Sequence, residues 1–289
     1  MFYHAPYGTL PHEEKKLIVL CRWFCLLACL PGLALASDRR PPVYPFALVN
    51  VWWKCSQTTD DLQELRVDFE IVREVSADYA LYIAPLGLIR LAEIAAYGGL
   101  QTQVHAWNSL HQQKPLTIGR GALFSRWARD GGKVPLAFMR GEAETYYEAD
   151  GYEGEFASVR SRYAWRSGHY SYRLVREQVS PPAGYSGRWY AASIERRGAG
   201  EVPQYIGSLF FEGKHFPLRP RIANFVEVYG RRSQIPESEV IFSPPQINGQ
   251  PCLPERVTPN FSVKYPKRYA TFEQLPDGRA RVVAVPEGY

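Results

Sequence analysis

The sequence predicts a mainly β protein that folds as an antiparallel β-sandwich of the jelly-roll or lectin-like type. Many short segments are rich in Val, Ile, Tyr, Phe and Trp, the residues that favour strands. Clusters of Gly, Pro, Asn or Asp separate most of these segments, and this spacing is typical of sandwiches and barrels. One segment also alternates as a half-buried strand does, with a core face of Val159, Ser161, Tyr163 and Trp165 and an outer face of Ser158, Arg160 and Arg162.

The expected strands follow one another with few interruptions. In chain order they cover residues 46–54, 62–74, 79–84, 101–107, 122–128, 143–149, 156–165, 169–177, 188–197, 204–212, 223–229 and 239–242. Residues 86–97 are ambiguous, because Leu and Ala recur there at helical spacing and Gly98-Gly99 follows as a typical helix stop. Helix and strand both stay open for this segment.

The C-terminal region departs from the regular spacing. Prolines cluster between residues 243 and 266 and predict a connector or an ordered wrap over the surface. Residues 268–285, centred on Pro276-Asp277-Gly278, predict a β-hairpin. The expected organisation is a leader at 1–36, a sandwich domain at 37–243, and a connector with an appended hairpin at 244–289.

The leader has the pattern of a secretory signal peptide. Lys15 and Lys16 precede an apolar run over 17–36 that closes with Ala34-Leu35-Ala36, which fits a cleavage site. The residues before Lys15 form a long lead-in, which suggests that translation starts later. We therefore expect export to the periplasm or the extracellular space.

Two alternatives for the leader stay open. About 20 apolar residues can span a bilayer, although Arg22 and Pro31 interrupt this run. Leu26-Leu27-Ala28-Cys29 loosely resembles a bacterial lipobox. A membrane is thus a partner only if the leader is retained or Cys29 is lipidated.

Removal of the leader leaves two cysteines, Cys55 and Cys252. Disulfides persist in exported proteins, so we predict that the two are bonded. Such a bond would tie the first strand to the C-terminal region. The alternative is a pair of buried free thiols.

Composition excludes several classes of protein. The chain is 46% hydrophobic and 22% charged, which excludes a disordered chain, and no repeat indicates a collagen or a coiled coil. The balance of 34 basic to 29 acidic residues is too mild for a nucleic-acid partner. Arginines far outnumber lysines and recognise carboxylates and sulfates, although a GC-rich genome would give the same bias.

The densest polar cluster lies between residues 142 and 155, where acidic residues alternate with tyrosines. Tyrosine rings can stack on sugars, and carboxylates in a turn can coordinate calcium. The alternative is a solvated strand and turn, and no other cofactor is expected. The predicted ligand-binding residues are Arg126, Tyr146, Tyr147, Tyr152, Glu153 and Arg162. The candidate calcium ligands are Glu148, Asp150 and Glu153.

Two weaker patterns point to enzymes that act on polysaccharides. Asp68 and Glu70 share one face of a strand, as in the acidic strand of laminarinase-like glycoside hydrolases, but Arg66 stands where the first carboxylate would be. The alternative is an exposed strand face with a local ion pair. His169 and Tyr172, with nearby arginines, would suit a lyase, although a lone histidine on a strand is more often structural.

Four segments in order resemble the uncharacterised exported domain family DUF3472. They are a Gly-rich turn leading to Gln101, a Leu-Phe-Ser-x-Trp strand at 123–127, a Tyr-x-Trp, Gly, Tyr hairpin at 163–175, and Gly187-Arg188-Trp189-Tyr190. The resemblance spans residues 62–229, but the Glu-Gly-x-Gly turn of the family is only partly kept at 153–156. It implies an exported β-sandwich often found near carbohydrate-handling modules and supplies no catalytic residues.

Three hypotheses for the function follow. The first is a module that binds a glycan or a cell-envelope polymer through exposed Tyr, Trp and Arg. The second is an enzyme, a glycoside hydrolase or a lyase. The third is an envelope interaction protein without a small ligand. Trp165, Tyr163 and Trp127 are expected in the core rather than at a binding surface.

Overall fold

The computed structural model describes residues 46–56, 58–151, 154–198, 200–229, 235–261 and 269–286. The predicted leader with Cys29, and the predicted site residues Tyr152 and Glu153, lie outside the described residues. Across the described ranges, no helix has the length and apolar character to cross a membrane.

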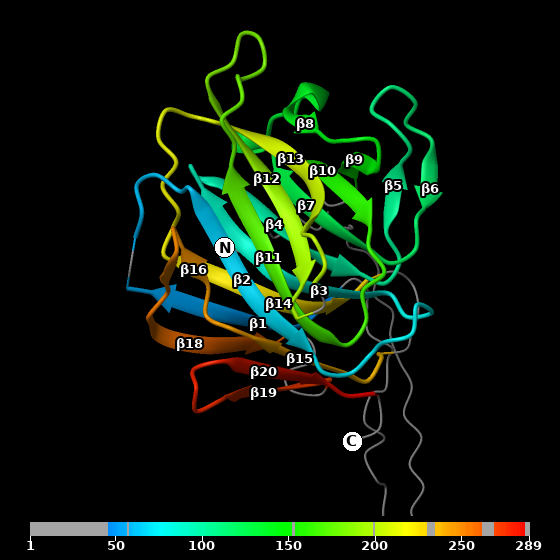
Figure 1. Cartoon of the computed structure of the whole chain (residues 1–289), viewed down its shortest axis with the longest axis vertical. Coiled ribbons are helices and arrows are strands. Elements are labelled where there is room, and N and C mark those ends of the chain that lie inside the picture. The colour runs from blue at the N-terminus through cyan, green and yellow to red at the C-terminus, as the bar shows by residue number, and fades with distance from the viewer. Residues whose placement is uncertain are drawn as a thin grey trace, which may run out of the picture. The chain divides into compact units, whose positions relative to one another are not determined.

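The protein is an antiparallel β-sandwich, as predicted, made of two large sheets that pack face to face (Figure 1). The first sheet runs in the order β18 (Pro254–Phe261), β1 (Phe46–Cys55), β14 (Arg221–Val228), β3 (Leu81–Leu91), β4 (Ile94–Gln101), β7 (Gly121–Trp127), β10 (Gly154–Arg162), β9 (Thr145–Gly151), β5 (His105–Trp107) and β6 (Pro115–Thr117). The second runs in the order β19 (Ala270–Gln274), β20 (Ala280–Ala284), β15 (Ser238–Phe242), β2 (Glu64–Ile71), β11 (Gly168–Arg176), β12 (Gly187–Arg196), β13 (Gln204–Glu212) and β8 (Met139–Arg140).

A few short elements complete the fold. The small pair β16 (Gln246–Ile247) and β17 (Gln250–Pro251) attaches to β2. Two single-turn 3-10 helices, η1 (Arg129–Gly131) and η2 (Leu136–Phe138), lie between β7 and β8.

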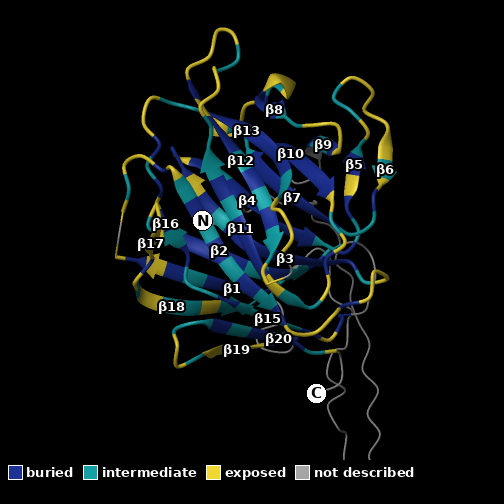
Figure 2. Ribbon diagram, in the orientation of Figure 1, coloured by how far each residue is buried: buried dark blue, intermediate teal, exposed yellow. Residues whose placement is uncertain are grey.

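The core lies between the two sheets, because successive side chains of a strand point to opposite faces. Along β2, alternate residues from Leu65 to Ile71 are buried while their neighbours are half-exposed (Figure 2). The buried aromatic side chains of the core also satisfy their polar atoms. Tyr172 donates its hydroxyl to the Leu123 carbonyl at 2.9 Å, and Trp53 Nε1 donates to Asn224 Oδ1 at 2.5 Å. Each fully buried large apolar side chain contributes about 1.5–3 kcal/mol to folding.

The ambiguous segment 86–97 forms strands rather than a helix. β3 and β4 pair as a hairpin whose turn residues, Ala92 and Glu93, have φ values of 48° and 67°. Both strands are buried on both faces, so their continuous apolar sequence imitates a helical pattern. Gly98 is a site of close packing instead of a helix stop, because a Cβ there would collide with the Tyr172 hydroxyl.

The predicted C-terminal hairpin is present as β19 and β20, but it extends the second sheet. β20 pairs with β15 from Ser238↔Ala284 to Phe242↔Ala280. β18 likewise pairs along β1 in the first sheet. The chain after residue 243 thus contributes to both layers of the sandwich and is not an appendage.

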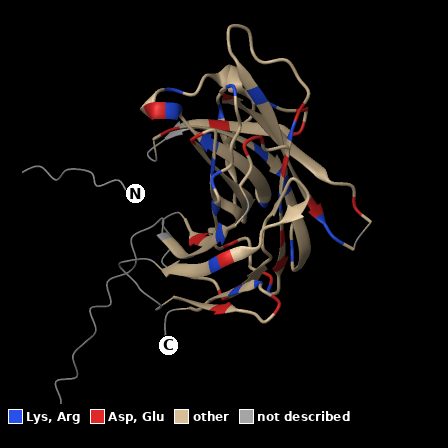
Figure 3. Ribbon diagram, turned by 90° about the vertical axis from the view of Figure 1, so that its left-hand side faces the viewer, with Lys and Arg blue, Asp and Glu red and all other residues tan. Residues whose placement is uncertain are grey.

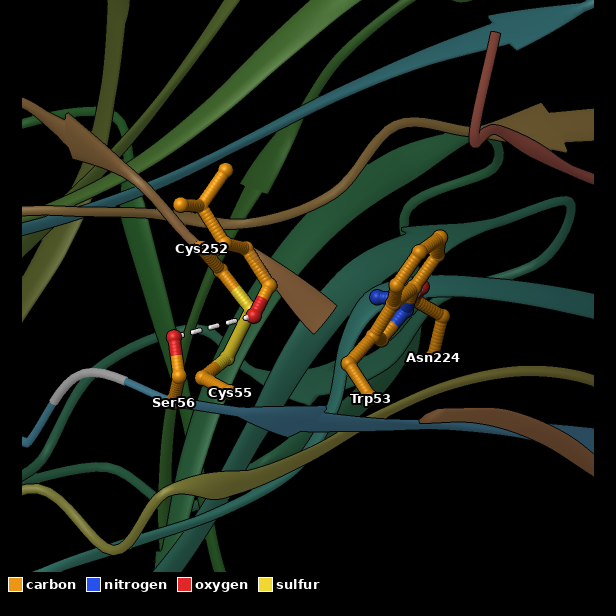
Figure 4. The surroundings of a disulfide bond; sticks show 6 residues. Trp53, Cys55, Ser56, Asn224 and Cys252 are labelled. Carbon is orange, nitrogen blue, oxygen red and sulfur yellow. Dashed lines mark hydrogen bonds between the residues drawn. A yellow bond between two sulfur atoms is a disulfide. The ribbon is translucent and has the colours of Figure 1, made fainter. Parts of the chain in front are cut away.

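The predicted disulfide is confirmed, joining Cys55 at the end of β1 to Cys252 after β17 (Figure 4). The two Cα atoms are 5.2 Å apart, and both residues are almost fully buried. Next to the bond, Ser56 Oγ donates to the Leu253 carbonyl at 3.2 Å. The bond therefore fastens the C-terminal region to the first strand.

Candidate functional site

A row of four aromatic rings crosses the outer face of the first sheet. We call Phe225, Tyr82, Tyr97 and Trp127 the aromatic row, one residue from each of the adjacent strands β14, β3, β4 and β7. Ring centroids are 5.0 Å apart for Phe225 and Tyr82, 6.3 Å for Tyr82 and Tyr97, and 4.5 Å for Tyr97 and Trp127. These separations lie in the range of favourable aromatic contacts.

The aromatic row is separate from the core between the sheets. Tyr82, Tyr97 and Leu123 form a second apolar cluster, against which Trp127 and Phe225 pack. Tyr82 and Tyr97 are 2% and 8% exposed, while Trp127 and Phe225 are half-buried. The expectation that Trp127 joins the core is therefore wrong, whereas Trp165 is buried in the core as predicted.

The Tyr82 hydroxyl is buried and has no hydrogen-bond partner among the described residues. Burial raises its pKa well above 10, with a further contribution from Tyr97, so it keeps its proton. Trp52, on the same face of β1, has a buried Nε1 that also finds no partner in the described part of the chain. Buried polar groups in native proteins normally have a partner, so the two unpaired donors on this face indicate positions where an ordered water would bind.

A polar border flanks the Trp127 end of the row on strands β7, β10 and β9. Ser125 Oγ donates to Ser158 Oγ at 2.8 Å, and Arg160 Nε donates to the same Ser158 oxygen at 2.9 Å. Arg160 also forms an ion pair with Glu148 and donates to the His105 carbonyl. Arg160 is 6% exposed, so its guanidinium is held in a fixed position.

Tyr146 and Arg162 meet at the outer edge of this border. Arg162 Nε donates to the Tyr146 hydroxyl at 3.1 Å, and the guanidinium lies 5.6 Å from the centre of the ring. Arg162 is exposed and Tyr146 is half-buried. The structure thus brings these two predicted residues together, at the opposite end of β10 from Phe156, the residue that pairs with Trp127.

Two other predicted ligand-binding residues face the interior. Tyr147 packs against the core between the sheets. Arg126 is fully buried there and pairs with Glu212 at 2.5 Å, beside the ring of Phe211 at 5.1 Å. Because alternate residues face opposite ways, Arg126 points inward where Trp127 points outward. Arg126 lies in the interior and does not reach either outer surface, and its role as a ligand contact stays a prediction.

The predicted calcium site is not assembled by the residues that the structure describes. Glu148 forms an ion pair with Arg160. The side chain of Asp150 and the whole of Glu153 are not among the parts that the structure describes. Within the described ranges, no group of three or more His, Cys, Asp or Glu side chains is placed to hold a metal ion. Calcium binding by the 148–153 turn stays a prediction.

The two enzyme patterns fall on the second sheet. Arg66 Nε donates to Asp68 Oδ1 at 2.8 Å, which is the local ion pair of the alternative interpretation. His169 lies on the outer face of β11, where its side chain is 65% exposed, whereas Tyr172 is buried in the core. His169 and Tyr172 therefore do not share a site.

The aromatic row is not visible in the sequence. Strands β3 and β4 are apolar on both faces, so the pattern along them does not separate core from surface. Alternation along β4 predicts only that Tyr97 and Gly98 point to opposite faces of the sheet. The alignment of the four rings depends on the register between strands.

Comparisons with known proteins leave the family open. No family model matches the chain, and no curated protein matches it. A similar solved structure is the marine PL-14 alginate lyase from Aplysia kurodai, with 9% sequence identity over 59% of this chain and 71% of that chain, at a TM-score of 0.21. A similarity of this size carries no argument about activity, and the resemblance to DUF3472 stays a prediction.

Proposed function

We propose that the protein binds a carbohydrate polymer across the outer face of its first sheet. The observation that carries this proposal is the aromatic row on this face. Aromatic faces offer sugars apolar contact. Trp127 and Phe225 are the more accessible members and would make the first contacts.

The arginines of the polar border favour an acidic polymer. Arg162 is exposed next to Tyr146 and can meet such a polymer, whereas Arg160 is buried and already paired with Glu148. Guanidinium groups bind carboxylates through paired hydrogen bonds. Polymers of the cell envelope often carry such groups, and the buried disulfide supports an exported protein that would meet them.

Binding is favoured over catalysis by the groups that gather on this face. Glycoside hydrolysis needs two carboxyl groups about 5–10 Å apart on either side of the sugar bond. Glu148 of the polar border forms an ion pair with Arg160, and Glu227, the carboxylate beside Tyr82, lies on β14, five strands away from β9 in the sheet. The described residues of the border otherwise supply rings, hydroxyls and guanidinium groups, which suit recognition.

The test is a glycan array followed by calorimetric titration of acidic and neutral polysaccharides. Trp127→Ala is expected to weaken binding at least tenfold, while Tyr185→Ala is the control, because Tyr185 is 45% exposed and packs on Phe138 away from the row. Equal binding by Trp127→Ala and the unaltered protein would contradict the proposal. A reducing-end assay on the same samples tests the alternative, since a released product would identify an enzyme.

A further inference from the structure

A small hollow of about 170 Å³ opens on the outer face of the second sheet, on the opposite layer from the aromatic row. Its polar lining comes from β2, β11, the ends of β12 and β15, and the turn before β20. The polar side chains are Asp68, Glu70, His169, Arg197, Ser243 and Arg279. The fold thus brings together charged residues that are far apart in the sequence. Over the ribbon as a whole, acidic and basic residues are interspersed (Figure 3).

Asp68 is fully engaged and acts as a support. Arg66 donates to both of its oxygens at 2.8 and 2.9 Å, and Ser171 Oγ donates to Oδ1 at 2.5 Å. Arg197 Nη1 donates to Oδ2 at 3.2 Å. With four donors, Asp68 has little capacity for a further partner, but it holds Arg197 at the rim of the hollow.

Glu70 is less fully paired than Asp68. Its Oε2 lies 3.8 Å from His169 Nδ1 and 3.7 Å from Arg279 Nη1, and both distances are too long for hydrogen bonds. The Glu70 side chain is 26% exposed. A carboxylate flanked by two donors that do not reach it can accept a hydrogen bond from a ligand.

The two arginines of the hollow also have N–H donors that their present hydrogen bonds do not use. Arg197 uses Nη1 for Asp68, and Arg279 uses Nε for Asp277 at 2.7 Å. A guanidinium has five N–H donors, so each has several more to offer. Their side chains are 52% and 36% exposed. The hollow therefore offers mainly donors, with one available acceptor at Glu70.

We propose that this hollow binds a single acidic sugar unit. The carboxylate of the sugar would lie between Arg197 and Arg279, and a neighbouring hydroxyl would donate to Glu70. An oxyanion with an adjacent hydroxyl matches this set of donors and one acceptor. The size agrees, because the hollow is smaller than the roughly 300–1,000 Å³ of pockets that hold drug-sized ligands. The site is independent of the aromatic row.

The experiment is an NMR titration of the whole chain, observing the imidazole signals of His169 at constant ionic strength. Glucuronate is expected to shift these signals and to saturate, and glucose to bind at least about tenfold more weakly, because it lacks the carboxylate. Arg279→Gln is expected to weaken glucuronate binding about tenfold or more. Arg173→Gln is the matched control, since Arg173 pairs with Glu64 on the same face outside the hollow.

A further ligand and a further variant in the same titration distinguish the possible binding sites. A disaccharide with a terminal uronate that binds as well as glucuronate would identify the end of a polymer as an accepted source. Trp127→Ala is expected to leave the titration unchanged, and loss of binding in that variant would overturn the proposal by moving the site to the aromatic row. Equal shifts with glucose or acetate, or no effect of Arg279→Gln in a variant with an unaltered circular dichroism spectrum, would also overturn it.

Discussion

The unpaired Tyr82 hydroxyl leads to a prediction with an unusual sign. Tyr82 and Tyr172 are both buried, and burial raises the pKa of each hydroxyl well above 10. They differ in one respect: Tyr172 donates to the Leu123 carbonyl at 2.9 Å, whereas Tyr82 has no partner among the described residues. Replacement by phenylalanine removes the same atom in both cases.

The two substitutions are expected to change stability in opposite directions. An unpaired buried hydroxyl is destabilising by about 1–3 kcal/mol, so Tyr82→Phe should raise the free energy of unfolding by up to that amount. Tyr172→Phe removes a hydrogen bond that contributes about 0.5–1.5 kcal/mol and should lower the free energy of unfolding. The free energies of unfolding of the two variants should therefore differ by about 2 kcal/mol or more.

Urea denaturation without ligand, followed by tryptophan fluorescence, measures both free energies of unfolding. Tyr82→Phe should have a higher urea midpoint than the unaltered protein, and Tyr172→Phe a lower one, with similar slopes. If Tyr82→Phe lowered the midpoint as much as Tyr172→Phe, the Tyr82 hydroxyl would have a partner in the folded protein, and the argument from its unpaired state would be refuted.

Three further predictions concern stability. The Cys55–Cys252 bond has a sequence separation of 197 residues, for which the chain-entropy model gives about 5 kcal/mol, so Cys55→Ala with Cys252→Ala should lower the free energy of unfolding by about 2–5 kcal/mol in urea titrations. The bond is excluded if the denatured, unreduced protein reacts with a thiol reagent. Burial raises the pKa of the Tyr82 and Tyr172 hydroxyls, so their contribution to the free energy of unfolding is fully present below pH 10 and is lost above it, by about 1.4 kcal/mol per pH unit for each. The absorbance of tyrosinate from these two residues should therefore appear together with unfolding. Titration of all tyrosines in the folded state would refute this. Glu212→Gln leaves the buried Arg126 guanidinium without its counter-charge and should lower the free energy of unfolding by about 3–5 kcal/mol. Glu93→Gln, in an exposed ion pair, should change the melting temperature little. Similar melting temperatures of the two variants would contradict the argument.

The candidate site was only partly predictable from the sequence. Tyr146 is predicted from the acidic and aromatic cluster at 142–155, and Arg162 from the separate segment at 158–165, where side chains alternate along one strand. Tyr147 and Arg126 face inward, because strand alternation turns both toward the core, which residue type alone does not reveal. Tyr82 and Tyr97 were missed because their strands are apolar on both faces.

The fold class, the C-terminal hairpin and the disulfide can all be predicted from the amino-acid sequence. Strand propensity, turn residues and the alternation of side chains are local properties, and only Cys55 and Cys252 remain after the expected leader. The tertiary structure alone decided which face of each buried strand meets the other sheet, that the hairpin extends a sheet, and which distant residues meet. The aromatic row needs the register of four strands, and the hollow brings Asp68 and Arg279 together across most of the chain. Such contacts depend on the pairing of distant strands, which no short stretch of sequence encodes.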